Sequence, residues 1–395
     1  MRSEDNQTEM ATASGLKIGK ILGIPIYLHI SWFPIFAFIT YELTQGFHHA
    51  NPAWSEEKLW AVGISTSILF FGSVVFHELS HSVIAQHYKI RVVSITLFLF
   101  GGIARIGREP SSAKQEFNIA VAGPLSSYSL SALFFGLMYS FPHSEIVGTS
   151  AAWLGWINLG LATFNLLPGF PLDGGRIFRA IVWGVKKDFS AATKIAGTTG
   201  KVVAYGMIAI GGWYCFRSQW DQGLWLVVLG YFLLNAAQES VAQLAVRETL
   251  AGLFASDVMS NDVPSITRDT SLEEYGAEVL RTGRRCHLVV TEDRLVGLMN
   301  VHALNSIPRD EWTQNSVQAV MIPRDRILWA APEEPLLRLL ERLLAADINQ
   351  MPVVSSVEEG DTHVVGMVTR DSILRVMQTR AELGAVPTKK ALSSN

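Results

Sequence analysis

Charged residues are scarce in this sequence of 395 residues: Asp, Glu, Lys and Arg make up 17%, against about a quarter in soluble globular proteins. The scarcity is confined to one part of the chain. Residues 1–246 contain 30 charged residues, about 12%, whereas residues 247–395 contain 37, about 25%. Together with a mean hydropathy of +0.25, this contrast predicts a membrane domain followed by a soluble domain.

Cysteine is nearly missing too. Cys215 and Cys286 lie in different parts of the chain, so a disulfide framework is excluded. The net charge of −3 at pH 7 gives no reason to expect a nucleic-acid partner. Composition also excludes a disordered or collagen-like chain.

Hydrophobic runs are abundant in the first part. A helix needs about 20 mainly apolar residues to cross the hydrocarbon core, and its backbone polar groups must be satisfied internally. Six stretches predict six transmembrane helices: 24–43, 59–86, 117–141, 151–167, 202–216 and 224–244. The segments on one side of these helices carry 14 Lys and Arg, and those on the other side carry two. Because Lys and Arg are enriched on the cytoplasmic side, both termini and the soluble domain are predicted to be cytoplasmic.

Residues 91–106 interrupt this pattern. They are apolar and β-branched, and Gly101-Gly102 divides them, which predicts a short β-hairpin associated with the membrane. A backbone of this kind at membrane depth must be covered by protein or line a wet cavity. The alternative is an amphipathic connector at the level of the headgroups.

The second hydrophobic stretch contains the sequence HELSH. On a helix, His77 and His81 lie on one face, one turn apart, where both imidazoles can bind a Zn²⁺ ion. Glu78 beside them is placed to take a proton from water. Ionisable residues inside a span are costly and indicate function, although a polar helix–helix contact is the simpler alternative.

A catalytic zinc site usually has a third protein ligand. The segment NLLPGFPLDGGR follows the fourth stretch, and its prolines and glycines interrupt the helix there. Asp173 in this segment is the predicted third ligand, because a broken helix lets a carboxylate enter the bundle. A DG dipeptide by itself indicates only a turn.

These motifs, with AGPL at residues 122–125 between them, resemble those of the site-2 proteases, which are zinc-dependent intramembrane proteases. The resemblance covers residues 16–246. It implies that His77, His81 and Asp173 bind zinc and that Glu78 is the general base. It also implies that Asn165 contacts the substrate or stabilises the oxyanion.

For Asn165 and His29, a simpler role than one in the active site is also possible. Asn165 is also consistent with an interhelical hydrogen bond. His29, within the first stretch, is a candidate for gating the site, and its alternative is an interfacial histidine beside Trp32.

A substrate helix must unwind before its carbonyls can be attacked. The hairpin at 91–106 is predicted to hold the unwound segment as an added strand.

Residues 254–378 contain an internal repeat. Each copy has a V-M start, a strand, a helix and a second strand that ends near a glycine, which predicts an α/β fold. The repeat resembles a tandem pair of cystathionine-β-synthase (CBS) domains, which bind adenine nucleotides such as ATP or AMP between the copies. By this resemblance Thr369 and Asp371 hold phosphate and ribose, whereas the first copy has Asn300 and His302 in these places. The alternative for Thr369 and Asp371 is a helix N-cap.

The sequence thus predicts a polytopic α-helical membrane protein with a C-terminal tandem CBS domain. We expect a cytoplasmic N-terminal segment (1–20), a six-helix protease domain (21–246), a cytoplasmic CBS pair (247–378) and a disordered tail (379–395). The predicted activity is zinc-dependent cleavage of a single-pass membrane protein within the bilayer. The resemblance suggests an anti-sigma factor or a transcription-factor precursor as the substrate. We also expect modulation by adenine nucleotide and a homodimer. The alternatives are a CBS-regulated transporter or channel, and an inactive scaffold.

Overall fold

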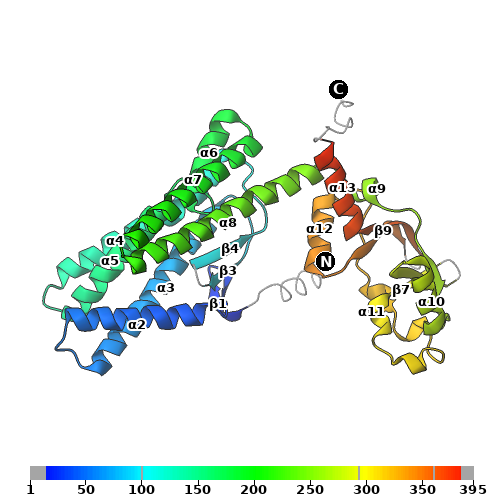
Figure 1. Ribbon diagram of the computed structural model, residues 1–395, viewed down its shortest axis with the longest axis horizontal. Coiled ribbons are helices and arrows are strands. Elements are labelled where there is room, and N and C mark those ends of the chain that lie inside the picture. Colours follow the sequence, from blue (N-terminus) through cyan, green and yellow to red (C-terminus); the bar gives the residue numbers. More distant parts are fainter. Residues whose placement is uncertain (1–14, 99–100, 292–293, 359–360, 384–395) are drawn as a thin grey trace. The chain divides into compact units, whose positions relative to one another are not determined.

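The computed structural model describes residues 15–98, 101–291, 294–358 and 361–383. The chain divides into two compact units, Met1–Leu244 and Ala245–Asn395. The first unit is mainly helical, and the second combines short helices with strands (Figure 1).

The first unit is a helical bundle, drawn from blue to green in Figure 1. Its helices are α2 (Trp32–Ala50), α3 (Glu56–His87), α4 (Ala113–Ser140), α5 (Glu145–Asn165), α6 (Asp173–Lys186), α7 (Phe189–Phe216) and α8 (Trp220–Leu250), the last of which ends in the second unit. A helix is present at each of the six predicted stretches. Among the described residues, three helices combine the length and apolar composition of a membrane span, namely α3, α4 and α8.

The predicted hairpin at residues 91–106 is confirmed. It consists of the antiparallel strands β3 (Val92–Phe98) and β4 (Gly101–Ile106). The hairpin belongs to a larger sheet of order β1-β2-β3-β4, in which β1 (Leu16–Ile21) pairs with β2 (Ile24–Leu28) and β2 runs parallel to β3. β4 is therefore an edge strand.

The prediction that a membrane helix starts at residue 24 is wrong, because residues 24–28 form β2 and α2 begins only at Trp32. A short apolar run fits a buried strand as well as a helix. Its neighbours decide here, since Ile24 and Ile95 of the sheet pack against Leu79 of α3 and Ile119 of α4. This packing holds the sheet against the helix that carries HELSH.

The second unit contains the predicted repeat. Its first copy has β5 (Ser265–Thr267), α10 (Leu272–Thr282), β6 (Cys286–Thr291), β7 (Arg294–Asn300) and α11 (Val301–Leu304). The second copy has α12 (Leu336–Ala345), β9 (Gln350–Glu358), β10 (Asp361–Thr369) and α13 (Arg370–Glu382). The short helix α9 (Ala255–Val258) is at the start of the first copy, and β8 (Ile322–Pro323) directly follows the V-M start of the second copy. Because β5 pairs parallel with β6, which pairs antiparallel with β7, the first copy has the expected α/β arrangement.

Packing between the two copies explains the pattern that they share, because the first residues of each copy contact the other copy. A Cβ at Gly366 would lie 2.7 Å from the sulfur of Met259, and a Cβ at Gly297 would lie 2.6 Å from the sulfur of Met321. The V-M start of one copy thus packs on the glycine of the other. Backbone hydrogen bonds of 2.9 Å in both directions between Ser260 and Met367 add to this exchange. The two copies therefore form one folded unit.

The predicted terminal segments lie mostly outside the described residues. Residues 1–14 and 384–395 are not described, and β1 starts within the predicted N-terminal segment. α13 extends to Glu382, so helix continues past residue 379, where the disordered tail was predicted to begin.

Candidate metal centre

The two histidines of HELSH lie on one face of α3. His77 and His81 are buried, with exposed fractions of 4% and 6%. Their ring centroids are 4.9 Å apart, and their Nε2 atoms are 3.2 Å apart. The spacing of four residues therefore brings both imidazole nitrogens to one point, as the helical period requires.

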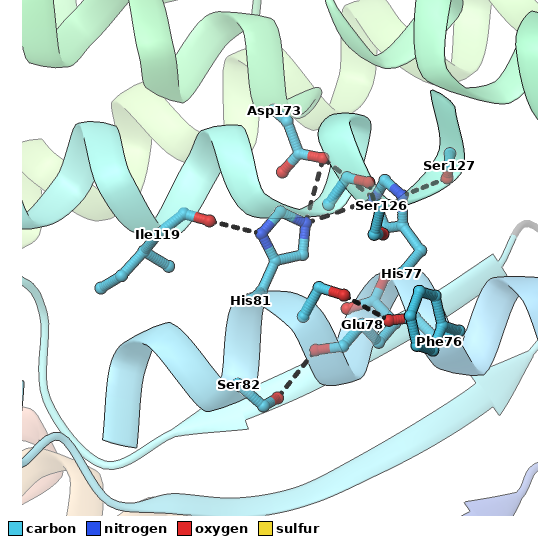
Figure 2. A network of polar contacts seen from close by, with 11 residues as sticks. Phe76, His77, Glu78, His81, Ser82, Ile119, Ser126, Ser127 and Asp173 are labelled. Atoms are coloured by element: carbon cyan, nitrogen blue, oxygen red, sulfur yellow. Dashed lines mark hydrogen bonds and ion pairs between the residues drawn. The ribbon is translucent and has the colours of Figure 1, made fainter. Parts of the chain in front are cut away.

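Asp173 reaches the same point from a distant part of the chain. It is the first residue of α6 and is buried, and its Oδ2 lies 3.1 Å from the Nε2 atoms of both His77 and His81 (Figure 2). α6 begins this close to the preceding loop because two glycines follow Asp173. A Cβ at Gly174 or Gly175 would lie 2.3 Å from the backbone of that loop.

The three atoms fit a zinc ion. They form a triangle with sides of 3.1, 3.1 and 3.2 Å. Ligand atoms about 2.0–2.1 Å from a tetrahedral zinc are roughly 3.3 Å from one another. Three protein ligands also leave a fourth position for water or substrate. Among the described residues, this is the one group of three or more His, Cys, Asp or Glu side chains with metal-binding geometry.

Hydrogen bonds to the outer ring nitrogens orient both imidazoles. Nδ1 of His81 donates to the carbonyl oxygen of Ile119 at 2.7 Å, and Nδ1 of His77 lies 2.9 Å from the Ser127 hydroxyl. A carbonyl can only accept, so in the neutral ring Nε2 of His81 carries a lone pair. This lone pair faces the carboxylate of Asp173 across 3.1 Å. A cation between the neutral ring and the carboxylate would satisfy both acceptors, which agrees with a metal at this point.

The AGPL motif leaves room for the metal ligands. A Cβ at Gly123 of α4 would lie 2.2 Å from Nε2 of His81 and 2.6 Å from Nε2 of His77. Only a glycine lets α4 pass so close to the two imidazoles. The motif, which sequence reasoning noticed without assigning a role, thus belongs to the wall of the metal site.

Glu78 lies beside the ligands in a cavity of about 610 Å³. The cavity is lined mainly by apolar side chains and also by His77, His81, Asp173 and Asn165. Gly102 of β4 lies against Glu78, because a Cβ there would be 2.5 Å from its Cγ. The sheet edge, the carboxylate and the three ligands therefore border one space.

Comparison with known proteins agrees with this geometry. The model of peptidase family M50 matches residues 65–148 and 141–207, which include the three ligands. A candidate zinc metalloprotease of Synechocystis is 32% identical in an alignment of 378 positions that covers 93% of this chain and 97% of that protein. The chain belongs to peptidase family M50, the site-2 proteases.

Other relatives differ in how much of this chain they cover. The candidate zinc metalloprotease Rip3 of Mycobacterium tuberculosis is 31% identical over 92% of each chain. The solved site-2 protease of Methanocaldococcus jannaschii is 32% identical and covers 57% of this chain and 95% of its own, with a TM-score of 0.40. The CBS domain model matches residues 317–379. The chain is thus a zinc metalloprotease with a CBS domain, and the transporter or channel alternative is set aside.

Two further predicted site residues of this M50 protease lie in different places. Asn165 ends α5 and lines the same cavity as Glu78. His29 follows β2, and its Nδ1 lies 2.8 Å from the hydroxyl of Ser31. His29 is not one of the described residues that line this cavity. Arg176, which sequence reasoning did not single out, does line it, and its place directly after the LDGG segment was the available signal.

The predicted nucleotide residues of the M50 protease line a second cavity, of about 750 Å³, within the CBS unit. Thr369 and Asp371 of one copy border it, and so do Asn300 and His302 of the other. Thr369 also caps α13, because its hydroxyl accepts from the Ser372 amide at 3.0 Å. The N-cap alternative is therefore confirmed for Thr369, and this role is compatible with a place in the cavity wall.

We predict that Gly123→Ala lowers the zinc affinity of this protease, and with it the zinc bound per chain after purification, by about tenfold or more, the range of effects known for groups that orient metal ligands. The added methyl group would occupy the space of the two Nε2 atoms. Gly136→Ala is the matched control, because it lies on the same helix with no atom within 4 Å of its Cβ position. Metal analysis of the purified proteins tests this, and equal zinc in both variants would contradict it.

Proposed function

We propose that this chain hydrolyses a peptide bond in a membrane-spanning substrate, with zinc held by His77, His81 and Asp173. The observation that supports this most is the triangle of ligand atoms, 3.1–3.2 Å on each side, in the same cavity as Glu78. Bound zinc would lower the pKa of water and polarise the scissile carbonyl.

The chain's own residues would supply the proton transfers. Glu78 would accept a proton from the attacking water and return it to the leaving amine nitrogen. The amide of Asn165, at the rim of the same cavity, would donate a hydrogen bond to the oxyanion that develops on the carbonyl. The apolar walls keep bulk water away and strengthen both interactions.

We infer that α2, α3, α4, α5, α7 and α8 cross the membrane. They have 19, 32, 28, 21, 28 and 31 residues, close to or above the length of about 20 that a span needs. α6 has 14 residues and would remain at the depth of the metal centre. In this proposal the protease domain at 21–246 lies in the membrane. The distribution of basic residues supports a cytoplasmic location for residues 1–20, the CBS pair at 247–378 and the tail at 379–395.

The substrate would enter as an additional strand beside β4. The sheet has two edge strands, β1 and β4, and β4 is the one that borders the cavity. This edge lies next to Glu78, as the close approach of Gly102 indicates. Strand addition would keep the substrate extended and expose its carbonyls to attack.

The CBS cavity supports a role in binding an adenine nucleotide such as ATP or AMP. Besides Thr369 and Asp371, it is lined by four arginines suited to phosphate: Arg284, Arg285, Arg326 and Arg370. Nucleotide binding there would modulate cleavage. A substrate of the anti-sigma or transcription-factor type and a homodimer stay predictions from the resemblance.

We expect Glu78→Gln to fold and retain zinc but to lose cleavage by at least about a hundredfold, the contribution of a general base. Membranes are prepared from cells that express the unchanged chain and from cells that express Glu78→Gln. Mass spectrometry then identifies single-pass proteins that are shortened only in the cells with the unchanged chain. Cleavage that persists in the variant would refute the assigned role of Glu78, and absence of zinc from the unchanged chain would refute the proposed function.

Disulfide cross-linking tests the strand edge. In a Glu78→Gln background without Cys215 and Cys286, Ile103→Cys on β4 is expected to cross-link a single cysteine placed near the cleavage site of a substrate. Ile18→Cys on β1, at the opposite edge of the sheet, is the control, since both isoleucines are about equally exposed, at 57% and 53%. Equal cross-linking at both edges would contradict strand addition at β4.

Asp371→Ala should weaken the binding of AMP or ATP by about tenfold, the effect of losing one charge-assisted hydrogen bond. Asp310→Ala is the control, because Asp310 is exposed and does not line the cavity. Calorimetry on the purified full chain measures both. Unchanged affinity in Asp371→Ala would show that the ribose is held elsewhere.

A further inference from the structure

A buried ion pair connects α6, the helix that begins with Asp173, to α4. The Glu116 carboxylate on α4 is fully buried, and only 11% of the Arg179 side chain on α6 is exposed. Nε of Arg179 donates to Oε1 of Glu116 at 2.7 Å, and its Nη2 contacts the same oxygen. The guanidinium also lies 4.8 Å from the ring centroids of Phe170 and Phe189. Arg179 is therefore enclosed on several sides.

One face of α4 carries this pair together with the supports of the metal site. Glu116, Ile119, Gly123 and Ser127 follow one another at intervals of three or four residues, which places them on the same side of a helix. In the same order they hold Arg179, accept from His81, leave space for the two imidazoles and contact His77. α4 is thus a common frame for parts of the site on two other helices.

Of these supports, the ion pair is the one that acts on the third ligand. Asp173 is at the start of α6, and Arg179 is six residues further on the same helix. No side chain caps the N-terminus of α6. The direction of the helix, and with it the place of the Asp173 carboxylate, therefore depends on how α6 is fixed to its neighbours.

A buried ion pair is a weak source of stability, because the desolvation of two charges offsets their attraction. What the pair provides is direction, since two N–H groups of one planar fork meet a single oxygen. Arg179 touches neither the metal ligands nor, in our proposal, the substrate. Its effect on the site would pass through the helix.

We propose that Glu116 and Arg179 are positioning residues, which hold α6 against α4 so that Asp173 meets the two imidazoles. This inference rests on the proposed function of His77, His81 and Asp173 as a zinc site. The loss of the pair would weaken zinc binding and alter the geometry of the site, even where the chain remains folded.

The test compares Arg179→Met, Arg179→Lys and the double variant Glu116→Met/Arg179→Met with the unchanged full-length chain. Ser131→Ala is the control, because Ser131 is buried on α4 but bonds to α5, through the carbonyl of Gly155 at 2.8 Å. Three quantities are measured for each: the zinc dissociation constant by chelator competition, the absorption spectrum of the Co²⁺ form, and the thermal midpoint without metal.

We expect Arg179→Met to raise the zinc dissociation constant about tenfold, as does the loss of other groups that support metal ligands. Arg179→Lys should give an intermediate value, because it keeps the charge but not the fork. The double variant should unfold without metal near the midpoint of the unchanged chain, since apolar residues replace the pair, yet bind zinc as weakly as Arg179→Met. The Co²⁺ spectrum should change in these variants and not in Ser131→Ala.

Zinc affinity and a Co²⁺ spectrum equal to those of the unchanged chain in Arg179→Met would overturn the positioning role. If Arg179→Met does not fold, the same result in Arg179→Lys or in the double variant overturns it. Failure of the unchanged chain to bind zinc would instead refute the proposed function. The two failures are therefore distinguishable.

Discussion

Two imidazoles and a carboxylate lie together in an apolar interior, and the packing of the protease unit around them holds them in this arrangement. A carboxylate removed from water is stable only with a compensating charge, and the His81 lone pair facing Asp173 provides none. A divalent cation bound by the three atoms would balance the carboxylate and would supply the chemistry proposed for the site. The surrounding features position these three ligands. Gly123 of α4 leaves space for the imidazoles, hydrogen bonds to both Nδ1 atoms orient the rings, and the tight start of α6 brings Asp173 to them.

The same constraint explains which parts of the site could be predicted from the sequence. His77 and His81 follow from the helical period alone, and Asp173 from a broken helix next to a membrane segment. Ser127 and the carbonyl of Ile119 could not be found in this way. A serine in an apolar helix and a backbone carbonyl carry no pattern of their own, since their roles depend on which helix lies opposite.

The fold shows the same division. The hairpin at 91–106 and the repeat in the second unit were predictable. A β-branched run divided by two glycines and an internal repeat can both be seen in the sequence itself. β2 was not, because residues 24–28 are apolar in either conformation. Only their parallel pairing with β3, about 70 residues further along the chain, makes them a strand. The exchange of V-M starts between the CBS copies likewise depends on tertiary packing at Gly297 and Gly366. Long-range pairing is therefore what the sequence alone did not provide.

X-ray absorption at the zinc edge of the purified full-length chain tests the central claim most directly. The account predicts one zinc with about four nitrogen and oxygen ligands at roughly 2.0–2.1 Å, with outer scattering from two imidazoles and loss of the metal in His81→Ala. A chain without zinc, a sulfur shell at about 2.3 Å, or zinc retained unchanged in His81→Ala would contradict it.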